Sequence, residues 1–233
     1  MRPTHCLLFV LVAPTLSAAS DETARDDERS HMVDTQLALR DISDQRTLAA
    51  MRKVPRHRFV PENVQQAAYT DGPLPIGHGQ TISQPYIVAY MTQVARITPD
   101  SKVLEVGTGS GYQAAVAAEL SNHVYSVEII PELAERAAAT LKDTGYERVN
   151  LRSGDGYHGW PEAAPFDVII VTAAANTIPP PLLAQLAEGG RMIIPVGPQF
   201  GAQNLVLVTK PGGKARTSML MPVTFVPFTR EDK

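Results

Sequence analysis

The chain has a single cysteine among its 233 residues, and this residue, Cys6, lies near the N-terminus. One cysteine cannot form a disulfide within the chain, and it cannot supply a zinc site built from several thiolates. The six histidines include no pair four residues apart and no His-x-x-Glu-His pattern. We therefore expect no metal in this protein.

An excess of charge of one sign is also lacking. The formal net charge is -3 and the pI is about 6.1, so the composition does not indicate a protein that binds nucleic acid through phosphate contacts. One short basic cluster, residues 52–58, is typical of a solvated helix end. We expect no nucleic-acid partner, no stable membrane association, and a monomer.

The N-terminus carries the features of a secretory signal peptide. Arg2 precedes a short apolar run, residues 6–16, and the small residues Ser17 to Ala19 follow it. The run is too short to span a bilayer. A second interpretation is that translation begins at Met32, where the organised sequence starts. We predict a signal-like leader and polar, mobile linker over residues 1–31 and one domain over residues 32–233.

Strand and helix patterns alternate along the rest of the chain. The continuous apolar run Phe166 to Val171 is typical of a strand buried on both faces. We predict an α/β fold with a doubly wound, mostly parallel sheet of the seven-stranded, Rossmann-like type over residues 98–233 and a helical cap over residues 32–97. Gly72 to Tyr86 is so rich in Gly and Pro that we predict an irregular loop there, ending where a helix begins at about Gln84.

A glycine-rich segment, EVGTGSG, follows the first predicted strand of the sheet. Gly107 and Gly109 let the backbone turn tightly and approach a ligand at the carboxyl edge of the sheet. Glu105 stands at the end of the strand itself. A dinucleotide fingerprint would place a small residue at position 112, but this residue is Tyr112. The segment therefore favours S-adenosylmethionine (AdoMet) over NAD.

Acidic residues also mark the next two strand ends. Glu128 comes about 20 residues after Glu105, as expected of a carboxylate that accepts hydrogen bonds from ribose hydroxyls. Asp155 lies between Gly154 and Gly156 after the third strand, where it can hydrogen-bond the exocyclic amine of a base. Because three consecutive strand ends carry such groups, we expect a nucleoside-containing ligand.

Several segments resemble a known family. VLEVGTGSGYQAAVAA is similar to the first motif of class I AdoMet-dependent methyltransferases. With PLPIGHGQTISQPYIVAYMT, VPRHRFVP, DVIIVTAAA and GGRMIIPVG, it resembles the protein-L-isoaspartate O-methyltransferase family over residues 32–228. The TISQP segment is specific to this family, whereas many methyltransferases share the glycine loop. Two departures, Asp41 where Gly is common and Asn176 where Pro is usual, touch no assigned role.

The resemblance implies methylation of the free α-carboxylate of L-isoaspartyl residues in damaged proteins and peptides, with AdoMet as the methyl donor. The methyl ester then cyclises to a succinimide, whose hydrolysis returns some normal aspartate. The resemblance also implies that Ser83 is the catalytic residue and that Ile82, Ser83 and Thr172 contact the substrate. The cofactor-binding residues that it implies are Glu105, Gly107, Gly109, Glu128, Asp155 and Gly156.

Two roles remain open for Ser83. A carboxylate is already ionised at pH 7, so the reaction needs no strong base, and Ser83 would orient the carboxylate by hydrogen bonding. Local sequence favours a different role, because a serine two residues before Pro85 is typical of a helix N-cap.

Two other functions and two locations also remain open. A small-molecule AdoMet-dependent O-methyltransferase or a non-catalytic AdoMet-binding module would share the glycine loop. The cytosolic synthesis of AdoMet favours a cytoplasmic protein, whereas the signal-like leader favours export to the periplasm.

Overall fold

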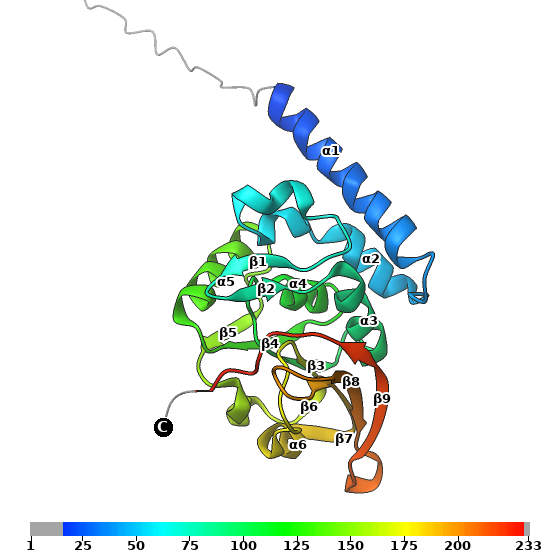
Figure 1. The fold of residues 1–233 in the computed structure, drawn as a ribbon, viewed down its shortest axis with the longest axis vertical. Helices are drawn as coiled ribbons and strands as arrows, with labels where there is room; N and C mark the ends of the chain where they lie inside the picture. The colour runs from blue at the N-terminus through cyan, green and yellow to red at the C-terminus, as the bar shows by residue number, and fades with distance from the viewer. Residues whose placement is uncertain (1–15, 231–233) are drawn as a thin grey trace, which may run out of the picture.

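The structure is a computed structural model that describes residues 16–230 and their side chains from residue 23 onward (Figure 1). Most of the signal-like segment, residues 1–15, therefore lies outside the described residues. None of the described helices is both long enough and apolar enough to cross a membrane.

A seven-stranded sheet forms the centre of the molecule, with strand order β5-β4-β3-β6-β7-β8-β9 (Figure 1). The pairs among β5, β4, β3, β6 and β7 are parallel, and β8 and β9 join antiparallel. This sheet confirms the predicted doubly wound α/β fold. The strands are β3 Lys102–Val106, β4 His123–Glu128, β5 Asn150–Ser153, β6 Phe166–Val171, β7 Leu186–Val196, β8 Gln203–Thr209 and β9 Arg216–Val223.

Helices cover both faces of the sheet, because side chains of the central strands alternate between two apolar clusters. Val103 and Ile170 belong to the cluster that includes side chains of α2 to α5. Leu104 and Ile169 belong to the other cluster, which includes α6. The helices are α2 Gln45–Lys53, α3 Pro85–Ala95, α4 Tyr112–Ala118, α5 Pro131–Asp143 and α6 Pro180–Gln185, with short 3-10 helices at Arg56–Phe59, Glu62–Ala67, Gly156–His158, Pro161–Ala163 and Pro211–Gly213.

The segment predicted as an irregular loop forms a hairpin, so this prediction was wrong. Strands β1 Leu74–Gly77 and β2 Gln80–Ile82 pair antiparallel. Residues 77–79 turn the chain with positive φ angles of 88°, 53° and 69°, which glycine at two of the three positions makes inexpensive. Ile76 and Ile82 are buried, so the hairpin has one apolar face packed on the domain.

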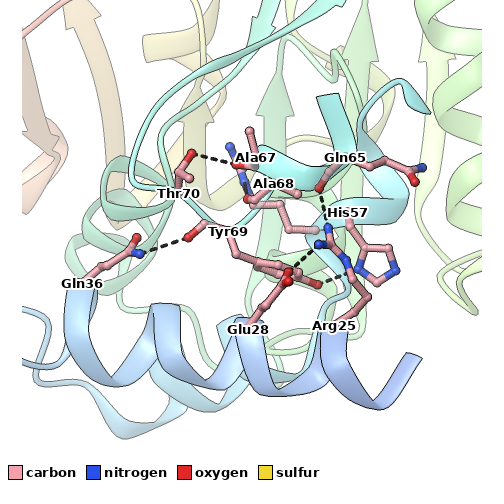
Figure 2. Close-up of polar contacts among 10 residues, drawn as sticks. Arg25, Glu28, Gln36, His57, Gln65, Ala67, Ala68, Tyr69 and Thr70 are labelled. Atoms are coloured by element: carbon pink, nitrogen blue, oxygen red, sulfur yellow. Dashed lines mark hydrogen bonds and ion pairs between the residues drawn. The ribbon is translucent and has the colours of Figure 1, made fainter. Parts of the chain in front are cut away.

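The polar segment before residue 32, predicted as a mobile linker, is helical. Helix α1 Leu16–Met32 continues into a π-helical turn, Val33–Leu37, and projects from the body of the molecule in Figure 1. Figure 2 shows Arg25 of α1 donating a hydrogen bond to the carbonyl oxygen of Gln65. Arg29 donates to the carbonyl oxygen of Arg52. Helix α1 is thus joined to the helical cap by side chains of its own.

The basic cluster is only partly solvated, which corrects the expectation of an exposed helix end. Arg56 is 0% exposed, and its Nε donates to the carbonyl oxygen of Ala68 at 2.8 Å. His57 is also buried, and its Nδ1 lies 2.7 Å from the Tyr69 hydroxyl (Figure 2). Burial lowers the pKa of Arg56 to about 10, so its guanidinium stays charged at neutral pH and ties the cap together.

Candidate functional site

A cavity opens at the carboxyl ends of the parallel strands β3, β4 and β6. This is the edge of a doubly wound sheet where ligands bind. Nearly all the residues predicted for the site line it: Ile82, Ser83, Glu105, Gly107, Gly109, Glu128, Gly156 and Thr172. The fold therefore brings together groups from positions 82 to 172, and Asp155 is the one predicted residue that is not part of the lining.

The glycine loop after β3 is fixed by Thr172, which directly follows β6. The Oγ1 of Thr172 donates to the carbonyl oxygen of Gly107 at 2.6 Å. Gly107 has a φ of +96°, and a Cβ atom there would lie 2.5 Å from the same Oγ1. No side chain fits at that distance, so glycine is required on steric grounds as well as for its backbone conformation.

Glu128, at the end of β4, holds the second half of the same loop. One carboxylate oxygen accepts the N–H of Gly109 at 2.7 Å, and the other accepts the N–H of Ile130 at 2.9 Å. Each oxygen retains a further lone pair. Glu128 can therefore accept hydrogen bonds from the hydroxyls of a ribose while it fixes the loop.

Glu105 is buried in the lining of the cavity. Its Oε2 accepts the hydroxyl of Ser126 at 2.5 Å, and Thr108 lies 2.5 Å from the same hydroxyl. Its Oε1 is also buried and has no hydrogen-bond partner among the described residues. Burial, together with the nearby charge of Glu128, raises the pKa of Glu105 to about 8. An unsatisfied buried carboxyl oxygen in a ligand cavity is costly unless a ligand donates to it.

Asp155 is engaged beside the cavity. Its carboxylate accepts the N–H of Tyr157 at 2.9 Å, which begins the 3-10 helix Gly156–His158. The same carboxylate pairs with Arg230 at 2.8 Å. The role predicted for Asp155 at the adenine thus stays a prediction, whereas its neighbour Gly156 does line the cavity.

Ser83 does not cap helix α3. The N-cap residue is Gln84, which makes no side-chain capping bond. The N–H of Tyr86 is bound instead by Asp71, whose Oδ1 lies 3.2 Å away. The Ser83 hydroxyl makes no hydrogen bond within residues 16–230, and Ser83 lines the cavity. The capping role, one of the two left open by the sequence, therefore belongs to Asp71.

A second groove, of about 490 Å³, adjoins the cavity. The two share Thr81, Ser83, Thr172 and Val226. One wall comes from the start of α3, and the other comes from residues 221–226 at the end of β9. The cavity and the groove therefore adjoin at Ser83 and Thr172.

The C-terminal tail also contributes to the cavity, although no motif in the sequence predicted it. Val226 to Thr229 line the cavity. Two backbone hydrogen bonds hold the tail. The N–H of Ala174 donates to the carbonyl oxygen of Val226 at 2.8 Å, and the N–H of Phe228 donates to the carbonyl oxygen of Ala174 at 2.9 Å. These residues carry no recognisable motif, and their position depends on a backbone pairing more than 50 residues away in sequence, so no local signal indicates them.

In the part of the chain that the structure describes, no cluster of three or more His, Cys, Asp or Glu side chains could hold a metal ion.

Comparison with known proteins gives a match over almost the whole chain. The model of the family described as protein-L-isoaspartate(D-aspartate) O-methyltransferase matches residues 27–233. A protein-L-isoaspartate O-methyltransferase of Opitutus terrae is 66% identical over 231 residues, which is 99% of this chain and 99% of the relative. One from Gloeobacter violaceus is 60% identical over 200 residues, covering 86% of this chain and 98% of the relative.

A solved structure shares the fold. A Plasmodium falciparum protein described as a protein-L-isoaspartate O-methyltransferase, in complex with S-adenosyl-L-homocysteine, superposes with a TM-score of 0.77 at 27% identity. The match covers 87% of this chain and 99% of that one.

Proposed function

Because the chain belongs to the protein-L-isoaspartate(D-aspartate) O-methyltransferase family, we propose that its cavity and its groove are the two halves of one methyl-transfer site. The enzyme transfers a methyl group from AdoMet to the free α-carboxylate of L-isoaspartyl residues in damaged proteins and peptides. We assign the cavity to the cofactor and the groove to the substrate because Ser83 and Thr172 line both of them.

The residues of the cavity fit AdoMet. The cofactor, when bound, supplies an electrophilic methyl group on a sulfonium and presents a cationic amine. The unpartnered Oε1 of Glu105 is an acceptor for such an amine, and Gly107 and Gly109 leave the backbone open to the methionine part. Glu128 would hold the ribose hydroxyls, and Gly156, together with Asp155 beside the cavity, would hold the adenine.

Ser83 is the catalytic residue of this proposal, and it acts by positioning. Since the capping bond at α3 is made by Asp71, the Ser83 hydroxyl is available to donate to the substrate carboxylate. Thr172 lines both the cavity and the groove, as Ser83 does, while its hydroxyl fixes the glycine loop. Ile82, only 4% exposed, supplies an apolar wall that limits water at the nucleophile. A carboxylate that is ionised at neutral pH needs orientation and partial desolvation rather than a base.

The test is methyl transfer from labelled AdoMet to an isoaspartyl peptide, with the normal aspartyl peptide as control. We expect label in the isoaspartyl peptide alone. Label in small molecules but in neither peptide would indicate a small-molecule methyltransferase instead. Binding of AdoMet without any transfer would indicate a non-catalytic module.

The role of Ser83 is tested by Ser83→Ala. Loss of one positioning hydrogen bond is expected to lower kcat/KM by about ten- to a thousandfold. Ser218→Ala is the matched control, because Ser218 is exposed on β9. Wild-type rates for Ser83→Ala would refute the assignment.

We further propose that the enzyme acts as a cytoplasmic monomer without nucleic-acid or membrane partners. Its net charge of -3 gives no electrostatic attraction to phosphate, and AdoMet is a cytosolic product. Light scattering measures the mass in solution. N-terminal sequencing of the native protein distinguishes a start at Met1 or Met32 from cleavage near Ser20, and cleavage would indicate export.

A further inference from the structure

The groove beside the cavity has an unusual distribution of charge. Its walls consist of apolar and uncharged polar residues, and among the described residues that line it only Arg40 is charged. Arg40 comes from the turn before α2, far in sequence from the motifs that carry the family resemblance around the glycine loop. Arg40 has no part in the cofactor binding or the methyl transfer proposed above.

Arg40 is held firmly in this position. Its guanidinium lies 3.3 Å from the centroid of the Tyr86 ring, and its Nη1 donates to Asp71 at 2.9 Å. The side chain is still 43% exposed. The Nε and Nη2 donors have no hydrogen-bond partner within residues 16–230, so an anion in the groove would find an oriented arginine with free N–H groups. Such a group loses little conformational freedom on binding.

The two neighbouring carboxylates do not prevent an anion in the groove from binding to Arg40. Asp71 is shared among three donors, since it also accepts Gln84 Nε2 at 2.7 Å and the N–H of Tyr86. Asp41 accepts the Tyr86 hydroxyl at 2.8 Å. Neither carboxylate lines the groove, whereas Arg40 does.

The spacing of Ser83 and Tyr86 limits the distance from Arg40 to the reacting carboxylate. Tyr86, on which Arg40 stacks, lies three positions after Ser83. Because Ser83 and Gln84 precede helix α3, these three residues of chain span at most about 10 Å. An extended peptide advances about 3.3 Å per residue. A substrate whose isoaspartyl carboxylate lies at Ser83 therefore brings a residue within about three positions of it to Arg40.

We propose that Arg40 is a specificity-determining residue that binds the carboxylate of an acidic side chain flanking the isoaspartyl residue. The inference rests on the proposed function, because it assumes a peptide in the groove with its reacting group at Ser83. An arginine whose Nε and Nη2 donors are both free pairs well with a carboxylate, and the partial exposure of the site limits the gain to a modest factor.

The experiment compares isoaspartyl peptides that differ only by Glu or Gln, placed one, two or three positions before or after the isoaspartyl residue. For the wild type at low salt we expect a KM about two- to fivefold lower for one of the Glu peptides than for its Gln partner. In Arg40→Gln the ratio should fall to about one, while Arg40→Lys should keep part of it. Arg58→Gln, which changes an exposed arginine outside the groove, should keep the full ratio.

Three results would overturn the inference. The first is an equal KM for every Glu and Gln pair in the wild type. The second is a lower KM for the Gln peptides. The third is a ratio that persists in Arg40→Gln. In each case methylation of the peptides would leave the proposed function intact, whereas absence of methylation in all peptides would overturn both.

Discussion

The buried carboxyl of Glu105 makes the stability of the free enzyme depend on pH. Its pKa lies near 8 in the folded chain, against about 4.3 for an exposed glutamate in an unfolded chain. Between these values the folded state binds a proton that the unfolded state has lost. Stability should therefore be highest on the acidic side of this window and fall as pH rises towards 8. Glu105→Gln removes the titrating group and keeps the shape.

The size of the effect follows from the linkage relation. Over each pH unit in which Glu105 is protonated in the folded state and ionised in the unfolded state, the free energy of unfolding falls by about 1.4 kcal/mol. Between pH 6 and pH 8 this amounts to about 2 kcal/mol, since the group is half ionised by the end of the range. The free energy of unfolding of Glu105→Gln, taken relative to that of the wild type, should therefore rise by about 2 kcal/mol from pH 6 to pH 8.

The assay is urea unfolding of both proteins without AdoMet at pH 6, 7 and 8. With a slope of about 2 kcal/mol per molar urea, the difference between the two midpoints should change by about 1 M. Histidines titrate equally in both proteins and cancel in the difference. Glu147→Gln, which alters an exposed glutamate, is the control and should track the wild type.

A constant difference in free energy of unfolding between wild type and Glu105→Gln from pH 6 to pH 8 would refute this reasoning. It would mean that Glu105 is ionised in the folded protein despite its burial.

Three further predictions concern the cofactor cavity and the N-terminal helix. Gly107→Ala should weaken AdoMet binding more than tenfold in calorimetry, because its methyl group would collide with a neighbouring hydroxyl, whereas Gly72→Ala, with no atom within 4 Å of its Cβ, should bind normally. Glu128→Gln should raise the Kd for S-adenosylhomocysteine by about tenfold; an unchanged Kd would exclude a ribose contact. A chain starting at Met32 should melt about 5 °C below one starting at Ser20, because it loses about two hydrogen bonds from α1; equal Tm values would show that α1 does not stabilise the domain.

The sheet and most of the cavity could be predicted because their signals are local. FDVIIV is apolar at five of its six positions, as expected of a buried strand. Glu105 and Glu128 lie within the last two residues of β3 and β4, so the edge of the sheet at which they lie follows from their position in the chain. Parallel strands then bring these ends to one edge.

The features that could not be predicted depend on long-range contacts. The hairpin at residues 74–82 exists because its apolar face packs on the domain, which overrides the low strand propensity of Gly and Pro. The cap of α3 comes from Asp71, twelve positions before Ser83, and no capping pattern at that spacing is known to sequence analysis. Arg56 is buried by tertiary packing that its charged neighbours in sequence do not indicate.

The backbone pairing of the C-terminal tail with Ala174 has a consequence for the cavity. Val226 to Thr229 form part of the cavity wall, and two hydrogen bonds between main-chain atoms join them to Ala174. Because these bonds use no side chain of the tail, single side-chain substitutions there should leave the wall in place. Removal of residues 226–229 should instead open the cofactor cavity to solvent.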